Sequence, residues 1–134
     1  MKNYNLQSSN NTLDSTTSKA MVLGNIDKSE IGRVYADVCK AHQLNNKWIM
    51  MIDPEDDALN SICYEDELDT KKILKVDTDG KQLSLETLEK TLKQGNCSAV
   101  IVGNKAFDSE SMARLNKCAQ VGNTTCVVLD KIIH

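Results

Sequence analysis

Two short, largely apolar runs constrain the fold of this chain more than any other feature. They span Trp48 to Ile52 and Cys97 to Val102, and turn or helix-start signals follow each of them. Both are far shorter than the roughly 20 residues that a helix needs to cross a membrane. Continuous rather than alternating apolar residues are typical of strands buried on both faces of a parallel sheet. The runs therefore predict an α/β fold in which these two strands are central.

Amphipathic segments separate the apolar runs. The expected helices begin near Asp27, Pro54 (running to Cys63), Ser84, and Asp108 or Ser109, and the other expected strands span 20–23, 73–76 and 125–129. Gly95 and Gly122 are expected to end the last two helices, because glycine readily adopts the left-handed conformation found there. This alternation predicts a three-layer domain with a mostly parallel sheet flanked by helices. The strands 20–23 and 73–76 suit its edges.

Residues 1–19 form a tract rich in Ser, Thr and Asn. Such a segment buries too little apolar area to offset the entropy lost on ordering. We expect a flexible polar tail over residues 1–19 and a single α/β domain over residues 20–134. The first residues also lack the apolar core of a secretory signal.

The overall charge and the cysteines narrow the class of protein. A net charge of −3 argues against a nucleic-acid binder that works by neutralising phosphates. The odd number of cysteines, without any Cys-x-x-C pair, favours reduced core thiols in a cytoplasmic protein over disulfides or a zinc site. The cysteines are Cys39, Cys63, Cys97, Cys118 and Cys126.

Motifs for nucleotide binding and for nucleophilic catalysis are missing. The chain has no Gly-x-x-x-x-Gly-Lys-Ser/Thr phosphate loop, no Gly-x-Gly-x-x-Gly and no Gly-x-Ser-x-Gly elbow. We therefore assign no catalytic, cofactor-binding or metal-binding residue. If the protein is a ligand-binding domain or an enzyme, its pocket is expected at the carboxyl ends of the strands. The polar residues there are Asp53, Asp77, Gly103 and Asp130.

Charge is unevenly distributed around the first central strand. Every charged residue from Asp53 to Asp69 is acidic, whereas Lys47, Lys71 and Lys72 flank this stretch. Helix-start acids and a solvated loop explain the acidic stretch better than a metal site does. The lysines suit a charged protein partner, with ordinary solvated surface as the alternative. Trp48 is interpreted first as a core residue and second as an interface anchor.

One combination of motifs resembles a known family. Lys47-Trp48 opens a strand, Asp53-Pro54 follows it, and Lys72 precedes the next strand. The run from Leu85 to Ile101 then reads Leu-Glu-x-Leu-x-x-x-Leu-x-x-Gly-Asn-Cys-Ser-Ala-Val-Ile, and a second Gly-Asn follows the next helix. In order and spacing this is similar to the SulA family of SOS-induced bacterial cell-division inhibitors. The similarity runs from about Lys47 to Val128.

The resemblance implies a RecA-like fold that lacks the phosphate-binding loop. It implies binding to the tubulin-like division protein FtsZ, a block of FtsZ polymerisation and GTP hydrolysis during the SOS response, and no catalysis by the inhibitor itself. It also implies a cytoplasmic homodimer that the Lon protease degrades, with Ile132-Ile133-His134 as a degradation signal if that tail is exposed.

Position by position, the resemblance places partner-binding residues at Lys47 and Lys72, with Ile62 and Ile52 as further candidates. Ile62 stands where the family often has an aromatic residue. Two alternatives remain open beside this function. One is a RecA-like regulatory paralogue with another protein partner, and the other is a small α/β ligand-binding domain or enzyme.

Overall fold

The computed structural model describes residues 19–42, 44, 46–56, 59–60, 70–79, 81, 83–103, 105–130 and 132–133. The polar segment 1–18 and Ile62 therefore lie outside the described residues, as does half of the helix expected from Pro54 to Cys63. Within the described part, no helix combines the length and the apolar character needed to cross a membrane.

A five-stranded parallel sheet forms the middle layer of the domain. Its strands are β2 (Ala20–Leu23), β4 (Trp48–Ile52), β5 (Ile73–Val76), β6 (Cys97–Val102) and β7 (Thr125–Leu129). Their spatial order is β2-β7-β6-β4-β5, and every neighbouring pair is parallel. The two most apolar strands are adjacent and interior, while β2 and β5 lie at the edges, as the sequence predicts.

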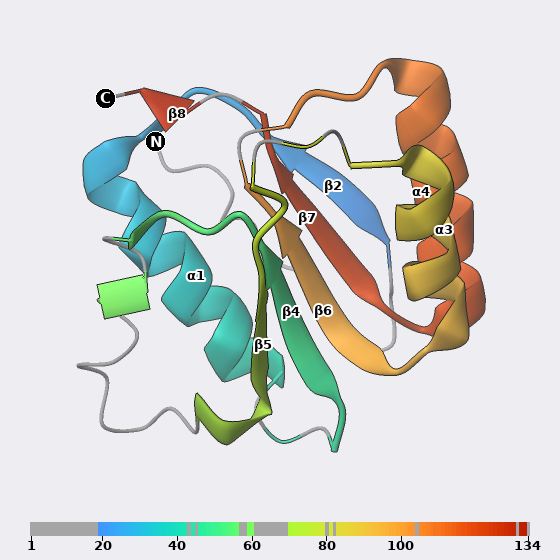
Figure 1. Ribbon diagram of the computed structural model, residues 1–134, viewed down its shortest axis with the longest axis horizontal. Coiled ribbons are helices and arrows are strands. Elements are labelled where there is room, and N and C mark those ends of the chain that lie inside the picture. Colours follow the sequence, from blue (N-terminus) through green and yellow to red (C-terminus); the bar gives the residue numbers. More distant parts are fainter. Residues whose placement is uncertain are drawn as a thin grey trace.

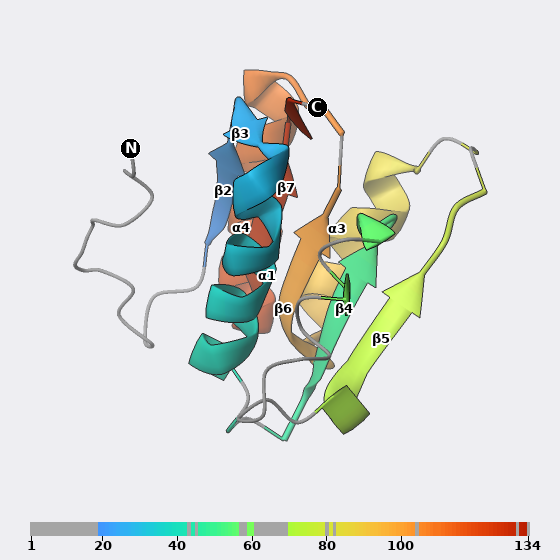
Figure 2. The same ribbon diagram turned by 90° about the vertical axis from the view of Figure 1, so that its left-hand side faces the viewer.

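Helices cover both faces of the sheet (Figures 1 and 2). The helix α1 (Lys28–His42) packs on one face, and α3 (Leu85–Gln94) and α4 (Ser109–Gly122) pack on the other. Each face of the sheet has its own hydrophobic core, and side chains of β4 contribute to both. Ile49 and Met51 pack in the core under α1, whereas Ile52 packs in the core under α3 and α4. The predicted three-layer α/β fold is confirmed.

Local signals in the sequence set the ends of the helices. Asp27 precedes α1 and accepts a hydrogen bond from the Ser29 amide at 3.2 Å. Ser84 caps α3 and Asp108 caps α4, each through its side-chain oxygen. Gly95 ends α3 with φ 71°. The end of α4 differs from expectation, since Gly122 is still helical and Asn123 is the left-handed residue, with φ 55°.

Two further elements lie outside the expected set. The short strand β3 (Ile26–Asp27) pairs in parallel with β8 (Ile132–Ile133) and forms a separate two-stranded sheet. The three-residue helix η2 (Thr70–Lys72) leads directly into β5. The backbone of Ile132–Ile133 is therefore hydrogen-bonded to the start of the domain.

Candidate partner-binding surface

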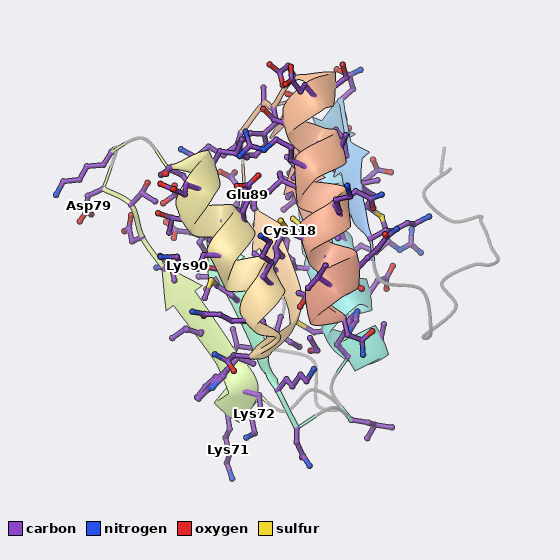
Figure 3. All side chains as sticks on the ribbon, turned by 90° about the vertical axis from the view of Figure 1, so that its right-hand side faces the viewer. Lys71, Lys72, Asp79, Glu89, Lys90 and Cys118 are labelled. Atoms are coloured by element: carbon purple, nitrogen blue, oxygen red, sulfur yellow. The ribbon has the colours of Figure 1, made fainter. Side chains whose placement is uncertain are left out.

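The structure places Lys47 and Lys72 at the same end of two adjacent strands. Lys47 immediately precedes β4, and Lys72 is the last residue of η2 before β5. The two strands run parallel with Ile49 opposite Ile73, so both lysines lie at the amino edge of the sheet. Figure 3 looks onto the face covered by α3 and α4, and shows Lys71 and Lys72 at the start of β5.

Trp48 joins the two lysines at this edge. Its side chain is 43% exposed, so the first interpretation of Trp48 as a core residue is wrong. The ammonium of Lys72 lies 5.6 Å from the centroid of its ring, within range of a cation–π interaction. The register between β4 and β6 also shifts here, because Trp48 lies opposite Cys97 whereas Ile49 lies opposite Ala99. Such a bulge redirects the side chain at the end of a strand.

A groove of about 550 Å³ opens beside Trp48, between the edge strand β5 and the C-terminal part of α3. The groove is lined on the sheet side by the apolar side chains of Trp48, Met50 and Leu74, from β4 and β5. On the helix side it is lined by Thr91 and Gln94 of α3. Leu74 is 40% exposed and lies opposite Met50. The sequence interpretation did not find this groove. Both Ile73 and Leu74 are apolar, so the pattern alone does not say which of them faces solvent.

The other two candidates are placed differently. Ile52 is 3% exposed, packs in the core against α3 and α4, and lies at the opposite end of β4 from Lys47. A partner that docks on this structure without rearranging it does not reach the Ile52 side chain, so we leave Ile52 out of the surface. Ile62 lies outside the described residues.

The thiols of the described cysteines are in the interior. Cys39, Cys97, Cys118 and Cys126 are free and buried. Burial raises the pKa of Cys39 to about 11 and that of Cys126 to about 12. At Cys97, which borders the groove, burial raises the thiol pKa against the opposing effect of the nearby Lys47 charge. Across the described ranges, no group of three or more His, Cys, Asp or Glu side chains is arranged to hold a metal ion.

The carboxyl edge of the sheet is closed at the point where sheets of this kind usually bind ligands. The chain leaves β4 toward β5 but leaves β6 toward β7, so the strand order reverses between β4 and β6. There the amide of Gly103 donates to the carbonyl of Ile52 at 2.9 Å. A Cβ atom on Gly103 would collide with the Asp53 carbonyl. Backbone therefore fills the crevice, and a side chain at Gly103 would not fit.

Asp53 connects the ends of three strands at this closed edge. Its carboxylate accepts hydrogen bonds from the Thr78 amide at 2.8 Å and the Thr78 hydroxyl at 2.6 Å, and lies 3.8 Å from Lys105 Nζ. Burial alone would raise the pKa of the Asp53 carboxyl, but the Thr78 hydrogen bonds and the Lys105 charge hold it below its usual range. These contacts link the segments that follow β4, β5 and β6.

Of the remaining polar residues of the carboxyl edge, Asp77 interacts with the Asp53 carboxyl and helps to lower its pKa, whereas Asp130 lies apart from it. The Asp77 carboxylate accepts from the Asp79 amide at 3.0 Å. The Asp130 amide donates to the Leu23 carbonyl at the far side of the sheet. Among the described residues, backbone and side-chain contacts join the strand ends at the place where the sequence analysis expected a ligand pocket.

A sequence model described as "Cell division inhibitor SulA" matches residues 37–126. A search of the solved structures gives the crystal structure of SulA from Pseudomonas aeruginosa, with a TM-score of 0.66 at 13% sequence identity. The match covers 85% of this chain and 98% of that one. None of the curated proteins matches this chain. The matched residues include the whole groove and both lysines at the amino edge.

Proposed function

This chain belongs to the SulA family of cell-division inhibitors, and we propose that it inhibits division by binding FtsZ. In this proposal, the inhibitor covers the surface that the next FtsZ subunit uses, so polymerisation stops. GTP hydrolysis also stops, because it requires the catalytic loop of that neighbouring subunit. The inhibitor performs no catalysis of its own and acts during the SOS response.

The observation that carries the proposal is the amino edge of the sheet. Lys47 and Lys72 lie on one surface there, next to an exposed tryptophan and inside the segment that matches the family. Clustered cations steer association with an acidic partner and set its orientation. A partly exposed tryptophan is the residue type most often found at the energetic centre of a protein interface.

The alternative functions draw less support. A small-molecule site is disfavoured by the backbone contacts that fill the crevice between β4 and β6. A regulatory paralogue with another protein partner would use the same exposed surface, so binding to FtsZ must separate it from the leading proposal. We further propose a cytoplasmic homodimer that is turned over by the Lon protease.

The test is direct binding to FtsZ from the same organism, measured with the wild-type protein and a Lys47→Glu/Lys72→Glu variant. We expect the wild-type protein to bind and the variant to lose binding while its circular dichroism spectrum stays unchanged. Lys81→Glu/Lys117→Glu, at exposed positions after β5 and on α4, is the matched control for the change in net charge. Equal binding by the two double variants would remove the amino edge from the proposal.

A further inference from the structure

We propose that the groove beside Trp48 binds one large apolar side chain, presented by an acidic segment of the protein partner. This inference rests on the proposed function and deepens it, because it assigns an apolar anchor to a surface otherwise defined by its lysines. The groove and its lysines would then recognise two chemical features of the same segment.

The apolar part of the inference rests on exposure. Trp48 and Leu74 are two of the few large apolar side chains that the described residues expose, and both line this groove. Met50 follows Trp48 by two residues on β4, lies opposite Leu74 and is only partly buried. A volume of about 550 Å³ is in the range of protein pockets that enclose small ligands, and it is large enough for a leucine or phenylalanine side chain. Burying such a side chain removes its apolar surface from water and so stabilises a complex.

The acidic part of the inference rests on charge. Among the described residues that line the groove, Lys47 is the charged one and none is a carboxylate. Lys72 lies over the Trp48 ring at the rim. Figure 3 also places Lys90 on the side of α3 that faces β5, outside the residues that line the groove. A partner segment with Asp or Glu on either side of its apolar residue would complement these cations.

The end of α3 and the position of β5 leave the groove open. The helix α3 ends at Gln94, where Gly95 turns the chain with φ 71° back into β6. β5 is the edge strand, so the sheet extends beyond the width that α3 covers. Leu74 lies on this margin, and Met50 opposite it is partly covered by the core under α3. The sheet face therefore offers an apolar strip that the domain itself leaves accessible.

The experiment compares two substitutions of the same chemical type. Leu74→Glu adds a carboxylate inside the groove, and Val121→Glu adds one at a 67% exposed position on α4, outside it. Leu74→Ala removes the apolar contact without adding charge. The dissociation constant for FtsZ is measured for each variant. We expect a rise of about tenfold or more for Leu74→Glu, a smaller rise for Leu74→Ala, and less than a twofold change for Val121→Glu.

A second readout follows the groove directly. Trp48 is the only tryptophan of the chain, so 5-fluorotryptophan labelling gives one ¹⁹F resonance that belongs to this site. We expect that resonance to shift when FtsZ is added to the labelled wild-type protein. Circular dichroism confirms that each variant is folded before binding is measured.

The possible outcomes are distinct. If the wild-type protein binds FtsZ while Leu74→Glu binds equally well and the ¹⁹F resonance does not move, the groove inference is wrong and the proposed function stands. If the wild-type protein does not bind FtsZ, both are wrong. If Leu74→Glu instead converts a dimer into a monomer in sedimentation and leaves FtsZ binding intact, the groove receives a second copy of this chain, which also overturns the inference.

Discussion

The carbonyl oxygen of Leu92 occupies the space where a Cβ atom on Gly122 would lie. The C-terminal ends of α3 and α4 meet at this point, and the Thr124 hydroxyl lies 3.2 Å from the same carbonyl. The close approach explains why a glycine occupies the last turn of α4 even though Asn123 makes the left-handed turn.

We therefore predict that Gly122→Ala destabilises the protein by about 1–3 kcal/mol, because backbone must move to admit the methyl group. On helix propensity alone the same change would stabilise by up to about 1 kcal/mol. Gly24→Ala is the control, since a Cβ there meets nothing within 4 Å. Chemical denaturation measures both variants. An unchanged or higher stability for Gly122→Ala would contradict the predicted collision.

The acid stability of the domain is predicted to depend on Asp53. Because its pKa is held below the usual carboxyl range in the folded state, its contribution is fully present above the unfolded pKa of about 3.9. That contribution is lost as the pH falls through the lower, folded pKa. Asp53→Asn removes the charge, so we expect a loss of about 1–3 kcal/mol at neutral pH and little difference from wild type at the acid extreme.

Asp79→Asn is the matched control for this experiment. Asp79 is exposed and, like Asp53, has a positive φ, so asparagine fits both backbones equally well. Urea unfolding between neutral and acidic pH gives the stability of all three proteins. A constant difference between wild type and Asp53→Asn across this range would refute a charge-dependent role for Asp53.

The buried thiols are predicted to resist alkylation in the native protein. Burial shields all four described thiols from reagents. It also raises the pKa of Cys39, Cys97 and Cys126, which keeps these three thiols protonated. Iodoacetamide labelling near pH 8, followed by peptide mass spectrometry, should modify these four cysteines only after denaturation. Rapid native labelling at Cys126 would contradict the interior placement of β7.

Trp48 is predicted to be accessible to solvent in the free protein. Acrylamide should quench its fluorescence readily, because 43% of the side chain is exposed. Removing the overlying ammonium with Lys72→Ala should increase the quenching constant, whereas Lys117→Ala on the distant helix α4 should not. Emission that resists acrylamide would mean that the ring is covered in solution.

Features that are determined by residues close together in the sequence could be predicted from it. Capping side chains at Asp27, Ser84 and Asp108 lie within a few residues of the amides that they bind, so a local pattern is enough to locate them. The continuous apolar character of β4 and β6 likewise reflects burial on both faces, and it led to the interior placement of both strands.

Features that depend on distant contacts could not be predicted. Nothing local to Ile26 indicates that it pairs with Ile132. The exposure of Trp48 depends on where α3 ends above the sheet, which the apolar run around the tryptophan does not encode. The closed crevice at Gly103 depends on the path of the chain after β4. The position of Lys47 and Lys72 at the same edge of the sheet was predictable, because parallel strands begin at the same edge.

The measurement that tests the central claim most directly is the GTPase activity of FtsZ from the same organism, titrated with this protein. We predict that hydrolysis falls and that the fall saturates near one protomer per FtsZ, as expected when the inhibitor removes subunits from assembly. Undiminished hydrolysis in the presence of excess folded protein would contradict the proposal that this chain blocks FtsZ.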